Sequence, residues 1–550
     1  MELLLGFLLA MSVTIALIPP LMHGAGRLHV LDMPSQRKVH AQPIPRVGGI
    51  AMAAGTLLAL LLWGGVAAPL PAFCTGIVIL LAFGVWDDRV TLGAGTKFLG
   101  QLAAALVVML WGDVSIGSLT LAERIDLPQW VAAPLTLFFI VGVTNAINLA
   151  DGLDGLAGGT TLLSLCAVAL LAWTSGSAFV GSAAVIIVGA VLGFLRFNTH
   201  PARVFMGDSG SQILGFSVAV LAVVLTQDTA TPLSSSLPLL LLGLPIIDTL
   251  MVMTQRMLAG HSPFRADRNH THHRLLALGL VHHEAVVAIY LLQAVLFLLA
   301  WFMRFESDIA IVATFIAFAS LVIGLLFAGE RCGWRLRDTT AGAGAPKSAL
   351  QGSIEWLRSP GRLPKWAYLT VTMLLLAYFA AVALACGGLS ADLRFLAIGV
   401  AMVAVLSLAW RRHATEPGWV DMGVLYVCAV LAVYLEMHKG TTAMPSWLEW
   451  TVFILMAMAI AVRLRLSSDR RFKITPLDVL VVFIALVIPN LPGSIVAPQG
   501  LGASVGKLIV LFYAVETLSA GIRPGAWRWP GVAATAFLLA CLSTGAGWLT

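Results

Sequence analysis

The chain has 550 residues, of which 59% are hydrophobic and 11% charged, and its mean hydropathy is +0.93. An average soluble protein carries about 25% charged residues, because the surfaces of large soluble domains need that charge. The composition excludes soluble, disordered and nucleic-acid-binding proteins, and it predicts a chain that crosses a lipid bilayer many times.

Continuous apolar runs rich in Leu, Ala and Val favour helices over a β-barrel, whose strands would alternate over about 10 residues. A spanning helix needs about 20 predominantly apolar residues. We therefore expect an all-α, polytopic membrane protein with about 18 transmembrane helices. In chain order the expected spans are residues 3–21, 46–66, 71–86, 97–113, 130–149, 158–173, 178–197, 209–226, 235–256, 284–303, 308–329, 366–386, 391–410, 420–437, 446–464, 476–491, 503–521 and 527–548.

Basic residues predict the orientation of these spans. Through residue 365, nineteen Lys and Arg residues follow odd-numbered spans and two follow even-numbered spans. The positive-inside rule then predicts an N-terminus outside the cell and cytoplasmic odd-numbered connections. No Lys or Arg precedes the first apolar run, so we do not expect it to be a cleaved signal peptide. The net charge of +6 reflects this topology, and no nucleic-acid partner is expected.

A basic segment rich in Gly, Ala and Pro interrupts the hydropathy and predicts a domain boundary. We expect an eleven-helix membrane domain over 1–330, a cytoplasmic linker over 331–365 and a seven-helix membrane domain over 366–550. The last domain carries no recognisable motif, and its acids are dispersed along the sequence. A non-catalytic scaffold, partner docking and lipid handling are the alternatives for its role.

The first polar motif is NAINLADGLDGL, residues 145–156, where the fifth expected span ends. Asn or Asp recurs at every third position, at Asn145, Asn148, Asp151 and Asp154. We expect Gly152 and Gly155 to end the helix and to let the two aspartates point into one polar pocket. Asn together with Asp suits a nucleobase or a cation, although a D-x-x-D pair alone is weak evidence.

The second motif, FMGDSGS at residues 205–211, enters the eighth expected span. Backbone N–H groups and hydroxyls at a helix N-terminus suit a phosphate, and Asp208 favours a bridging Mg²⁺. The alternative is that Asp208 or Ser209 is a helix N-cap. Capping does not explain the neighbouring Arg196, His200 and Arg203.

Two further features place acids at or near the same side of the membrane. Asp87 and Asp88 end the third span, where one could bind metal and the other could orient a nucleophile; a solvated turn is the alternative. Asp248 lies about 12 Å into the ninth span, and a carboxylate in a membrane indicates a functional site by default.

Two connections are strongly basic. The connection over 260–275 contains SPFRADRNHTHHRL, and we favour diphosphate binding by its Arg and His residues over a structural zinc site. The first connection, 32–49, contains RKVHAQPIPRVGG and by itself could bind lipid headgroups. Together the motifs predict one cytoplasmic pocket that transfers a phosphoryl group between a soluble nucleotide and a lipid phosphate.

These five motifs, in this order over about residues 27–280, resemble the bacterial polyprenyl-phosphate N-acetylhexosamine-1-phosphate transferases. The R-A-D-R-N-H-x-H-H-R-L form is similar to the branch that uses UDP-N-acetylglucosamine, with Thr271 as a minor departure. The resemblance implies that undecaprenyl phosphate attacks the β-phosphorus of a UDP-N-acetylhexosamine and that UMP leaves. It implies Mg²⁺ as cofactor, with Mn²⁺ as an alternative, and a first membrane step of cell-surface polysaccharide synthesis.

The resemblance also implies roles for individual residues. The catalytic residues would be Asp87, Asp88 and Asp208, and the metal ligands Asp208, Asp88 and Asp154. Whether Asp87 is a base or only positions the lipid phosphate stays open. Substrate would be bound by Lys38, Arg46, Asn148, Asp151, Asp154, Phe205, Arg265, Arg268, His270, His272, His273 and Arg274.

The expected location is the bacterial cytoplasmic (inner) membrane, with the active site on the cytoplasmic face. The oligomeric state stays open, with a homodimer as one alternative. The rival function is a transporter that uses Asp248 and the other aspartates as an ion path. Transporters usually place ionisable groups near the midplane, often within inverted repeats, so the enzyme is favoured.

Overall fold

The computed structural model describes residues 2–33, 42–64, 69–121, 123–227, 233–262, 270–333, 362–385, 389, 391–410, 419–439, 444–466, 501–521 and 528–543. The chain divides into two compact units. Unit 1 comprises Met1–Gly342 with Thr475–Leu480, and unit 2 comprises Ala343–Ile474 with Val481–Thr550.

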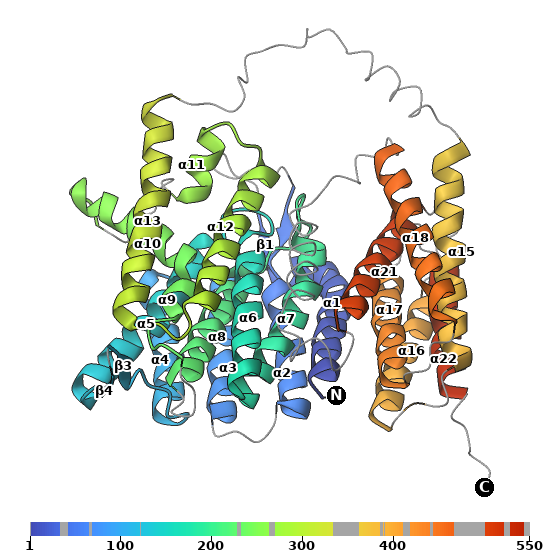
Figure 1. Cartoon of the computed structure of the whole chain (residues 1–550), viewed down its shortest axis with the longest axis horizontal. Coiled ribbons are helices and arrows are strands. Elements are labelled where there is room, and N and C mark those ends of the chain that lie inside the picture. Colours follow the sequence, from blue (N-terminus) through green and yellow to red (C-terminus); the bar gives the residue numbers. More distant parts are fainter. Residues whose placement is uncertain are drawn as a thin grey trace. The chain divides into compact units, whose positions relative to one another are not determined.

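Unit 1 is a helical bundle in which each of the eleven expected spans contains helix (Figure 1). Its helices are α1 Glu2–Leu28, α2 Gly48–Trp63, α3 Pro69–Val90, α4 Ala94–Leu110, α5 Gln129–Ala150, α6 Leu156–Ser175, α7 Ala178–Asn198, α8 Gly207–Gln227, α9 Pro238–Leu241, α10 Gly243–Leu258, α11 Thr271–Ala277, α12 His282–Phe302 and α13 Asp308–Arg331. Helices suit this composition because they satisfy their own backbone hydrogen bonds in an apolar medium.

The expected span 235–256 is not one continuous helix. It is divided into α9 and α10 at Leu242, whose backbone angles (φ −116°, ψ 17°) are not helical. Pro238 begins α9, and Pro245 lies in the first turn of α10, where its missing N–H leaves no helical hydrogen bond unmade. The break leaves α10 as a separate helix whose last turn precedes the His-rich connection.

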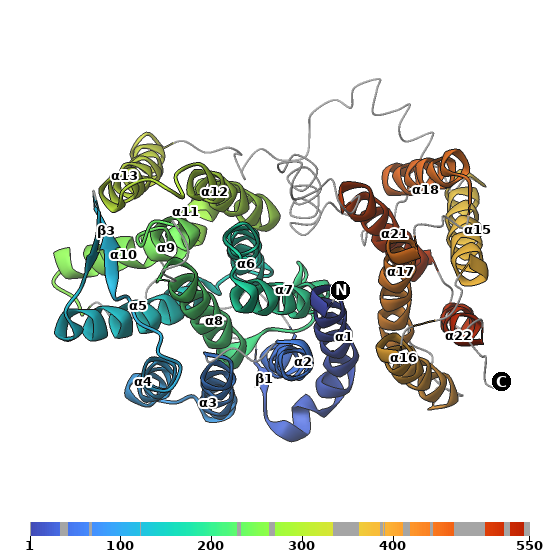
Figure 2. The same ribbon diagram turned by 60° about the horizontal axis from the view of Figure 1, so that its bottom comes forward.

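Helix α8 is the most enclosed candidate span, with 94% of its most apolar stretch buried. It packs against α3 and α5, and α6 and α2 also contact it (Figure 2). Phe73 of α3 stacks on Phe216 of α8, with ring centroids 5.8 Å apart and planes 13° apart. This packing brings the end of α3, the start of α8 and the end of α5 together.

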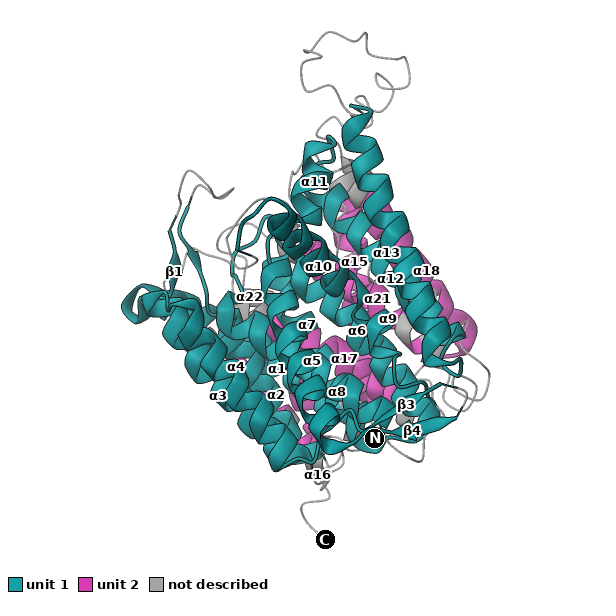
Figure 3. Ribbon diagram, turned by 90° about the vertical axis from the view of Figure 1, so that its left-hand side faces the viewer, with its two compact units in different colours: residues 1–342, 475–480 teal, residues 343–474, 481–550 magenta. Residues whose placement is uncertain are grey.

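Two short antiparallel pairs supplement the helices at opposite ends of unit 1 (Figure 3). Strand β1 (Leu31–Asp32) pairs with β2 (Ile44–Pro45), and β3 (Ser118–Thr120) pairs with β4 (Arg124–Asp126). The β1–β2 pair lies at the end that carries the polar motifs, because Phe205, just before α8, donates its amide to Pro45 O at 2.8 Å and accepts from Gly48 at 3.0 Å. Apart from these two pairs, the regular secondary structure of the described residues is helical, as expected.

Unit 2 is described by six helices, which are α15 Arg362–Ala385, α16 Ala391–Trp410, α17 Trp419–Lys439, α18 Ser446–Leu466, α21 Leu501–Gly521 and α22 Arg528–Ser543. The expected span 476–491 lies outside the described residues. Across the described parts of both units, ten helices are long and apolar enough to cross a membrane, and five shorter helices are also apolar. The chain is a multi-pass helical membrane protein; the count of eighteen and the outside N-terminus stay predictions.

Candidate functional site

A lysine joins two of the expected catalytic aspartates. Lys97, in the first turn of α4, lies with its Nζ 2.6 Å from Asp87 Oδ2 and 2.5 Å from Asp208 Oδ2. Asp87 is in the last turn of α3 and also accepts a hydrogen bond from the Leu92 amide at 2.5 Å. The end of α3 and the start of α8 thus present two carboxylates to one cationic centre.

Asp88 has a different environment from its neighbour Asp87. Its Oδ1 accepts from the Asp208 amide at 3.0 Å, and its Oδ2 accepts from the Ser209 amide at 3.3 Å and hydroxyl at 2.9 Å. A carboxylate at a helix N-terminus accepts hydrogen bonds from the free N–H groups there, and its negative charge interacts favourably with the positive end of the helix dipole. Asp88 therefore caps α8 from another helix, which fixes the position of Asp208.

The backbone before α8 requires a glycine. Gly207 has φ +71°, and a Cβ there would lie 2.4 Å from Asp88 Oδ2. Side chains of L residues disfavour this conformation, and no side chain would fit beside the carboxylate. The Gly-Asp pair of the motif is thus explained by the cap.

Accessibility distinguishes the three aspartates. The side chain of Asp208 is 28% exposed, whereas those of Asp87 and Asp88 are 4% and 1% exposed. Mg²⁺ takes one or two carboxylates together with substrate oxygens and water. Asp208 and Asp87 fit such a donor set, because they already converge on a single positive group, Lys97. Asp88 is less suited to bind the metal, since both its oxygens accept hydrogen bonds from α8.

A layer of amide side chains supports the carboxylates. Asn148 donates to Ser211 Oγ at 2.7 Å and, at 3.4 Å, to Asp208 Oδ1. One turn deeper, Asn145 donates to Gln101 Oε1 at 2.7 Å, and Gln101 lies 3.3 Å from Gln212 Oε1. The asparagines of the NAINLADGLDGL motif therefore connect α5 with α4 and α8.

The glycines of that motif end the helix as expected: α5 ends at Ala150, and α6 begins at Leu156. The pKa of Asp151, in the loop between them, is raised to about 7. Burial is the main cause, and the carboxylates of Asp208, Asp154 and Asp88 add to it. The loop thus adds a carboxyl group to the electrostatic environment of the α3 and α8 aspartates.

Asp154, the second aspartate of the loop, contacts the connection between α7 and α8. Its Oδ2 accepts from His200 Nδ1 at 2.8 Å and from the Ala202 amide at 3.0 Å. Burial alone would raise the pKa of Asp154, but these hydrogen bonds outweigh it and hold the pKa below its usual range. Neither of these hydrogen bonds reaches Asp208, so the expected role of Asp154 as a ligand of the same metal stays a prediction.

The His-rich motif forms the short helix α11, which is anchored on Asp248. The buried Asp248 carboxylate lies 2.7 Å from His270 Nδ1 and accepts from the Thr271 amide at 2.6 Å. His272 stacks near His270, and His273 contacts His272 at 4.2 Å between ring centroids. Burial, and then the neighbouring His273, lower the pKa of His272 to about 3. Asp248 therefore orients α11, and His272 is a neutral imidazole near neutral pH.

Arg274 is held by the protein itself. Its guanidinium donates to Glu330 at 2.9 Å and to Gln255 Oε1 at 2.6 Å, and it lies 4.7 Å above the ring of Phe327. Buried arginines are stable when paired in this way. These contacts fasten α11 to α10 and α13, which is a structural use for a residue expected to bind diphosphate.

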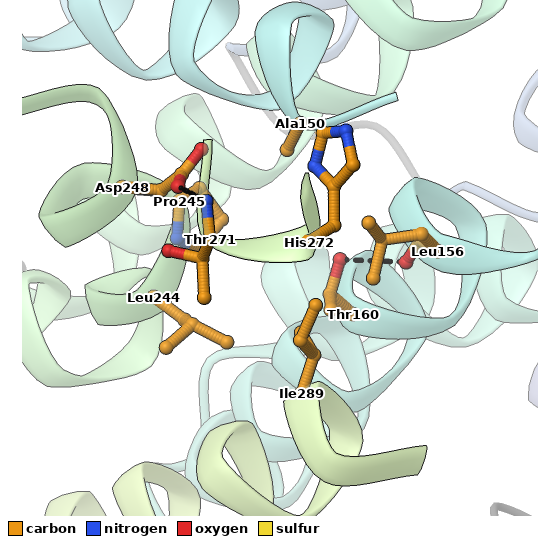
Figure 4. A pocket seen from close by; sticks show the side chains of 9 residues that line it. All are labelled: Ala150, Leu156, Thr160, Leu244, Pro245, Asp248, Thr271, His272 and Ile289. Carbon is orange, nitrogen blue, oxygen red and sulfur yellow. Dashed lines mark hydrogen bonds between the residues drawn. The ribbon is translucent and has the colours of Figure 1, made fainter. Parts of the chain in front are cut away.

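A pocket lies beneath the loop and α11 (Figure 4). Its lining comes from α5, α6, α10, α11 and α12, namely Ala150, Leu156, Thr160, Leu244, Pro245, Asp248, Thr271, His272 and Ile289. A Cβ at Gly152 would lie 2.3 Å from His272 Nε2, so the loop and α11 meet at this glycine. The DGLDGL and His-x-His-His motifs are therefore adjacent in space.

The remaining expected residues fall into two groups. Arg46, next to β2, forms an ion pair with Asp32 and lies 3.9 Å from Asp88; Phe205 is half-buried and links the start of α8 to β2 through its backbone. Lys38, Arg265 and Arg268 lie outside the described residues.

Lys97 and Gln101 are absent from the residues expected from sequence. Lys97 is one of the nineteen basic residues that follow odd-numbered expected spans, and Gln101 lies inside an apolar run. Their spacing of four residues on α4, nine residues after the Asp-Asp pair, is the signal that could have identified them, because it puts both on one helix face.

Unit 2 also contains a buried charged cluster. Lys507 of α21 pairs with Glu436 of α17 and Glu449 of α18, and Tyr378 of α15 donates to Glu436 at 3.0 Å. Two acids from different helices thus share one cation that lies far from both of them in sequence. The cluster joins four helices of the unit.

The fold and the site define a class: a polytopic helical membrane protein with acidic and basic side chains gathered at one end of its first unit. Residues 70–226 match the model of glycosyl transferase family 4. The probable undecaprenyl-phosphate N-acetylglucosaminyl 1-phosphate transferase of Bacillus subtilis (strain 168) is 37% identical over 296 residues, which are 53% of this chain and 82% of the relative.

Two further relatives agree. The decaprenyl-phosphate N-acetylglucosaminephosphotransferase of Mycobacterium tuberculosis (strain ATCC 25618 / H37Rv) is 36% identical over 53% of this chain and 80% of its own length. The undecaprenyl-phosphate alpha-N-acetylglucosaminyl 1-phosphate transferase of Escherichia coli (strain K12) is 31% identical over 50% and 76%. The chain belongs to the polyprenyl-phosphate N-acetylhexosamine-1-phosphate transferase family, and each of these alignments covers about half of it.

Proposed function

We propose that the chain transfers N-acetylhexosamine-1-phosphate, with N-acetylglucosamine as the preferred sugar, from a UDP-sugar to undecaprenyl phosphate. The products are UMP and undecaprenyl-pyrophosphoryl-sugar. The names of the relatives support the reaction. The observation that carries it in this chain is the convergence of Asp87 and Asp208 on Lys97 at the end of the bundle. The transporter alternative has no comparable support.

The reaction makes one bond and breaks one bond. An oxygen of the lipid phosphate bonds to the β-phosphorus, and the bond from that phosphorus to the bridging oxygen breaks, so the electron pair leaves with UMP. Both reactants are anions, so catalysis depends on positioning and on neutralising charge. Lys97 supplies a fixed positive charge between the two carboxylates, and Asp88 fixes Asp208 through the backbone of α8.

Magnesium suits the donor set, with Asp208 as the principal ligand and Asp87 beside it. When bound, Mg²⁺ would neutralise the diphosphate oxygens. We assign Asp88 to positioning, because its oxygens already accept hydrogen bonds from α8. Mn²⁺ would fit the same oxygens.

We assign the loop over 151–155 and helix α11 to the nucleotide and sugar side of the site. Asn148 donates a hydrogen bond to Asp208, and the charge of Asp208 raises the pKa of Asp151. His272 of α11 faces the same loop, and His270 stacks near it. The site would lie on the cytoplasmic face of a bacterial inner membrane, because UDP-sugars are made in the cytoplasm. The reaction would begin the synthesis of a cell-surface polysaccharide.

A product assay tests the proposal. The purified full chain, incubated with undecaprenyl phosphate, Mg²⁺ and UDP-N-acetylglucosamine, should release UMP and form the pyrophosphoryl lipid. UDP-N-acetylgalactosamine in a parallel reaction tests the sugar, and EDTA tests the metal. Absence of UMP with every UDP-amino-sugar would refute the function; undiminished UMP release in EDTA would refute only the role of Mg²⁺.

A further inference from the structure

We propose a second cation site in unit 1, separate from the Asp208 cluster, in which Asp154, His200 and His282 bind a transition metal of the Zn²⁺ type. Asp154 lies in the loop before α6, His200 in the connection from α7 to α8, and His282 is the first residue of α12. Three segments that are distant in sequence each contribute one side chain. The proposal does not depend on the transferase activity.

The three side chains are close enough to share one ion. One ligand atom from each residue lies within 4.8 Å of the others. His200 Nδ1 is 2.8 Å from Asp154 Oδ2, and the rings of His200 and His282 stack with centroids 4.2 Å apart and planes 23° apart. Nitrogen and oxygen ligands lie about 2.0–2.2 Å from Zn²⁺, so the three ligand atoms would move closer together around a bound ion.

The tautomer of His282 favours metal binding. His282 makes a hydrogen bond to the backbone of Asp154, and its Nε2 is buried without a hydrogen-bond partner. The bond must therefore come from Nδ1, which donates and leaves a lone pair on Nε2. Metal-binding histidines have this arrangement, in which the other ring nitrogen donates to a backbone carbonyl and fixes the tautomer. A buried nitrogen without a partner is unfavourable, and a bound metal ion would give Nε2 a partner.

The donor set selects the kind of metal. Two imidazoles and one carboxylate suit Zn²⁺, whose sites accept nitrogen and oxygen ligands and often leave one position for water. Magnesium prefers oxygen ligands and suits the Asp208 cluster instead. Asp154 also accepts from the Ala202 amide at 3.0 Å, which would hold the carboxylate in place.

A binding measurement on the full chain tests the site without using activity. Zn²⁺ would be titrated by equilibrium dialysis against the wild type, His200→Gln and His282→Gln. The matched control is His261→Gln, because His261 is exposed and lies outside the cluster. We expect one equivalent to bind to the wild type and the control, and each cluster variant to lose at least tenfold in affinity. We also expect Zn²⁺ to raise the unfolding temperature of the wild type but not of the cluster variants.

Asp208→Asn distinguishes the two sites. It should keep the Zn²⁺ equivalent, because Asp208 is not part of the cluster. Unchanged Zn²⁺ affinity in both His200→Gln and His282→Gln would overturn the proposal. So would loss of the equivalent in Asp208→Asn alone, since Zn²⁺ would then bind at the Asp208 cluster. Unfolding temperatures recorded without metal show whether each variant is folded.

Discussion

The carboxylate of Asp88 accepts a hydrogen bond of 3.0 Å from the backbone amide of Asp208, which lies 120 positions further along the chain. This contact gives the two members of the Asp-Asp pair different tasks. Asp88 faces the N-terminus of α8 and positions it, while Asp87 faces Lys97. A change at either aspartate should therefore have a distinct signature.

Asp88→Asn should weaken the cap on α8, because an amide has only one oxygen to accept hydrogen bonds from Asp208 and Ser209. Loss of a cap costs about 0.5–2 kcal/mol, so the unfolding temperature should fall together with activity. Asp87→Asn should reduce kcat with a smaller effect on stability. Thermal unfolding and UMP release, measured on both variants, compare them. Asp88→Asn with unchanged stability and a strongly raised Mg²⁺ requirement would show that Asp88 is a metal ligand instead.

Gly207→Ala should destabilise the start of α8 by about 1–2 kcal/mol, because Gly207 has φ +71° and L residues disfavour this conformation. The added Cβ would also meet Asp88 Oδ2 at 2.4 Å and should disturb the cap. Gly324→Ala in α13 is the matched control, since a Cβ there meets nothing within 4 Å. Equal unfolding temperatures for the two variants would contradict the strain assigned to Gly207.

The raised pKa of Asp151 predicts how stability depends on pH. The pKa is about 7 in the folded chain against an ordinary value of 3.8. Below both values the carboxyl is protonated in both states. Between them the unfolded chain releases its proton and the folded chain keeps it, so stability falls as pH rises from about 4 to 7. Asp151→Asn should remove this part of the decline, and the difference in unfolding free energy between wild type and variant should therefore change with pH. A difference that stays constant over this range would contradict the assignment.

Lys507→Met should destabilise unit 2, because it leaves the carboxylates of Glu436 and Glu449, whose side chains are 11% and 7% exposed, without their cation. Removing one partner of a buried ion pair costs about 3–5 kcal/mol. Adding Glu436→Gln and Glu449→Gln to Lys507→Met should recover most of the loss. Chemical unfolding of the full chain compares the single and triple variants, and a Lys507→Met chain as stable as the wild type would refute a structural role for the cluster.

Hydropathy predicted helices wherever the chain supplies about 20 apolar residues, and the glycines after Ala150 correctly predicted the end of α5. The division of 235–256 at Leu242 was not predicted, because an apolar composition does not show where backbone angles change. The positions of the motifs along the chain predicted that they lie at one end of the bundle, but they could not predict which side chains pair with each other. The pairings of Asp154 with His200 and of Arg274 with Glu330 depend on packing between helices that are distant in sequence.

The role of Lys97 could not be predicted from its sequence position either. A lysine at a membrane boundary is common, so its sequence position alone carries little information. Only the packing of α3 against α8 and α4 brings Asp87, Asp208 and this ammonium group together. The acids of unit 2 are similar, because their dispersal in sequence conceals the convergence of Glu436 and Glu449 on Lys507.

The most direct test of the Asp208 site is UMP release by Asp208→Asn beside Asp113→Asn. Both changes remove one carboxylate charge from unit 1 with little change in shape, but Asp113 is exposed and follows the far end of α4 from Lys97. We predict that Asp208→Asn lowers kcat at least about a hundredfold while the chain stays folded, as loss of a charge-stabilising group does. Asp113→Asn should keep wild-type activity. Near-normal turnover by a folded Asp208→Asn chain would contradict the account.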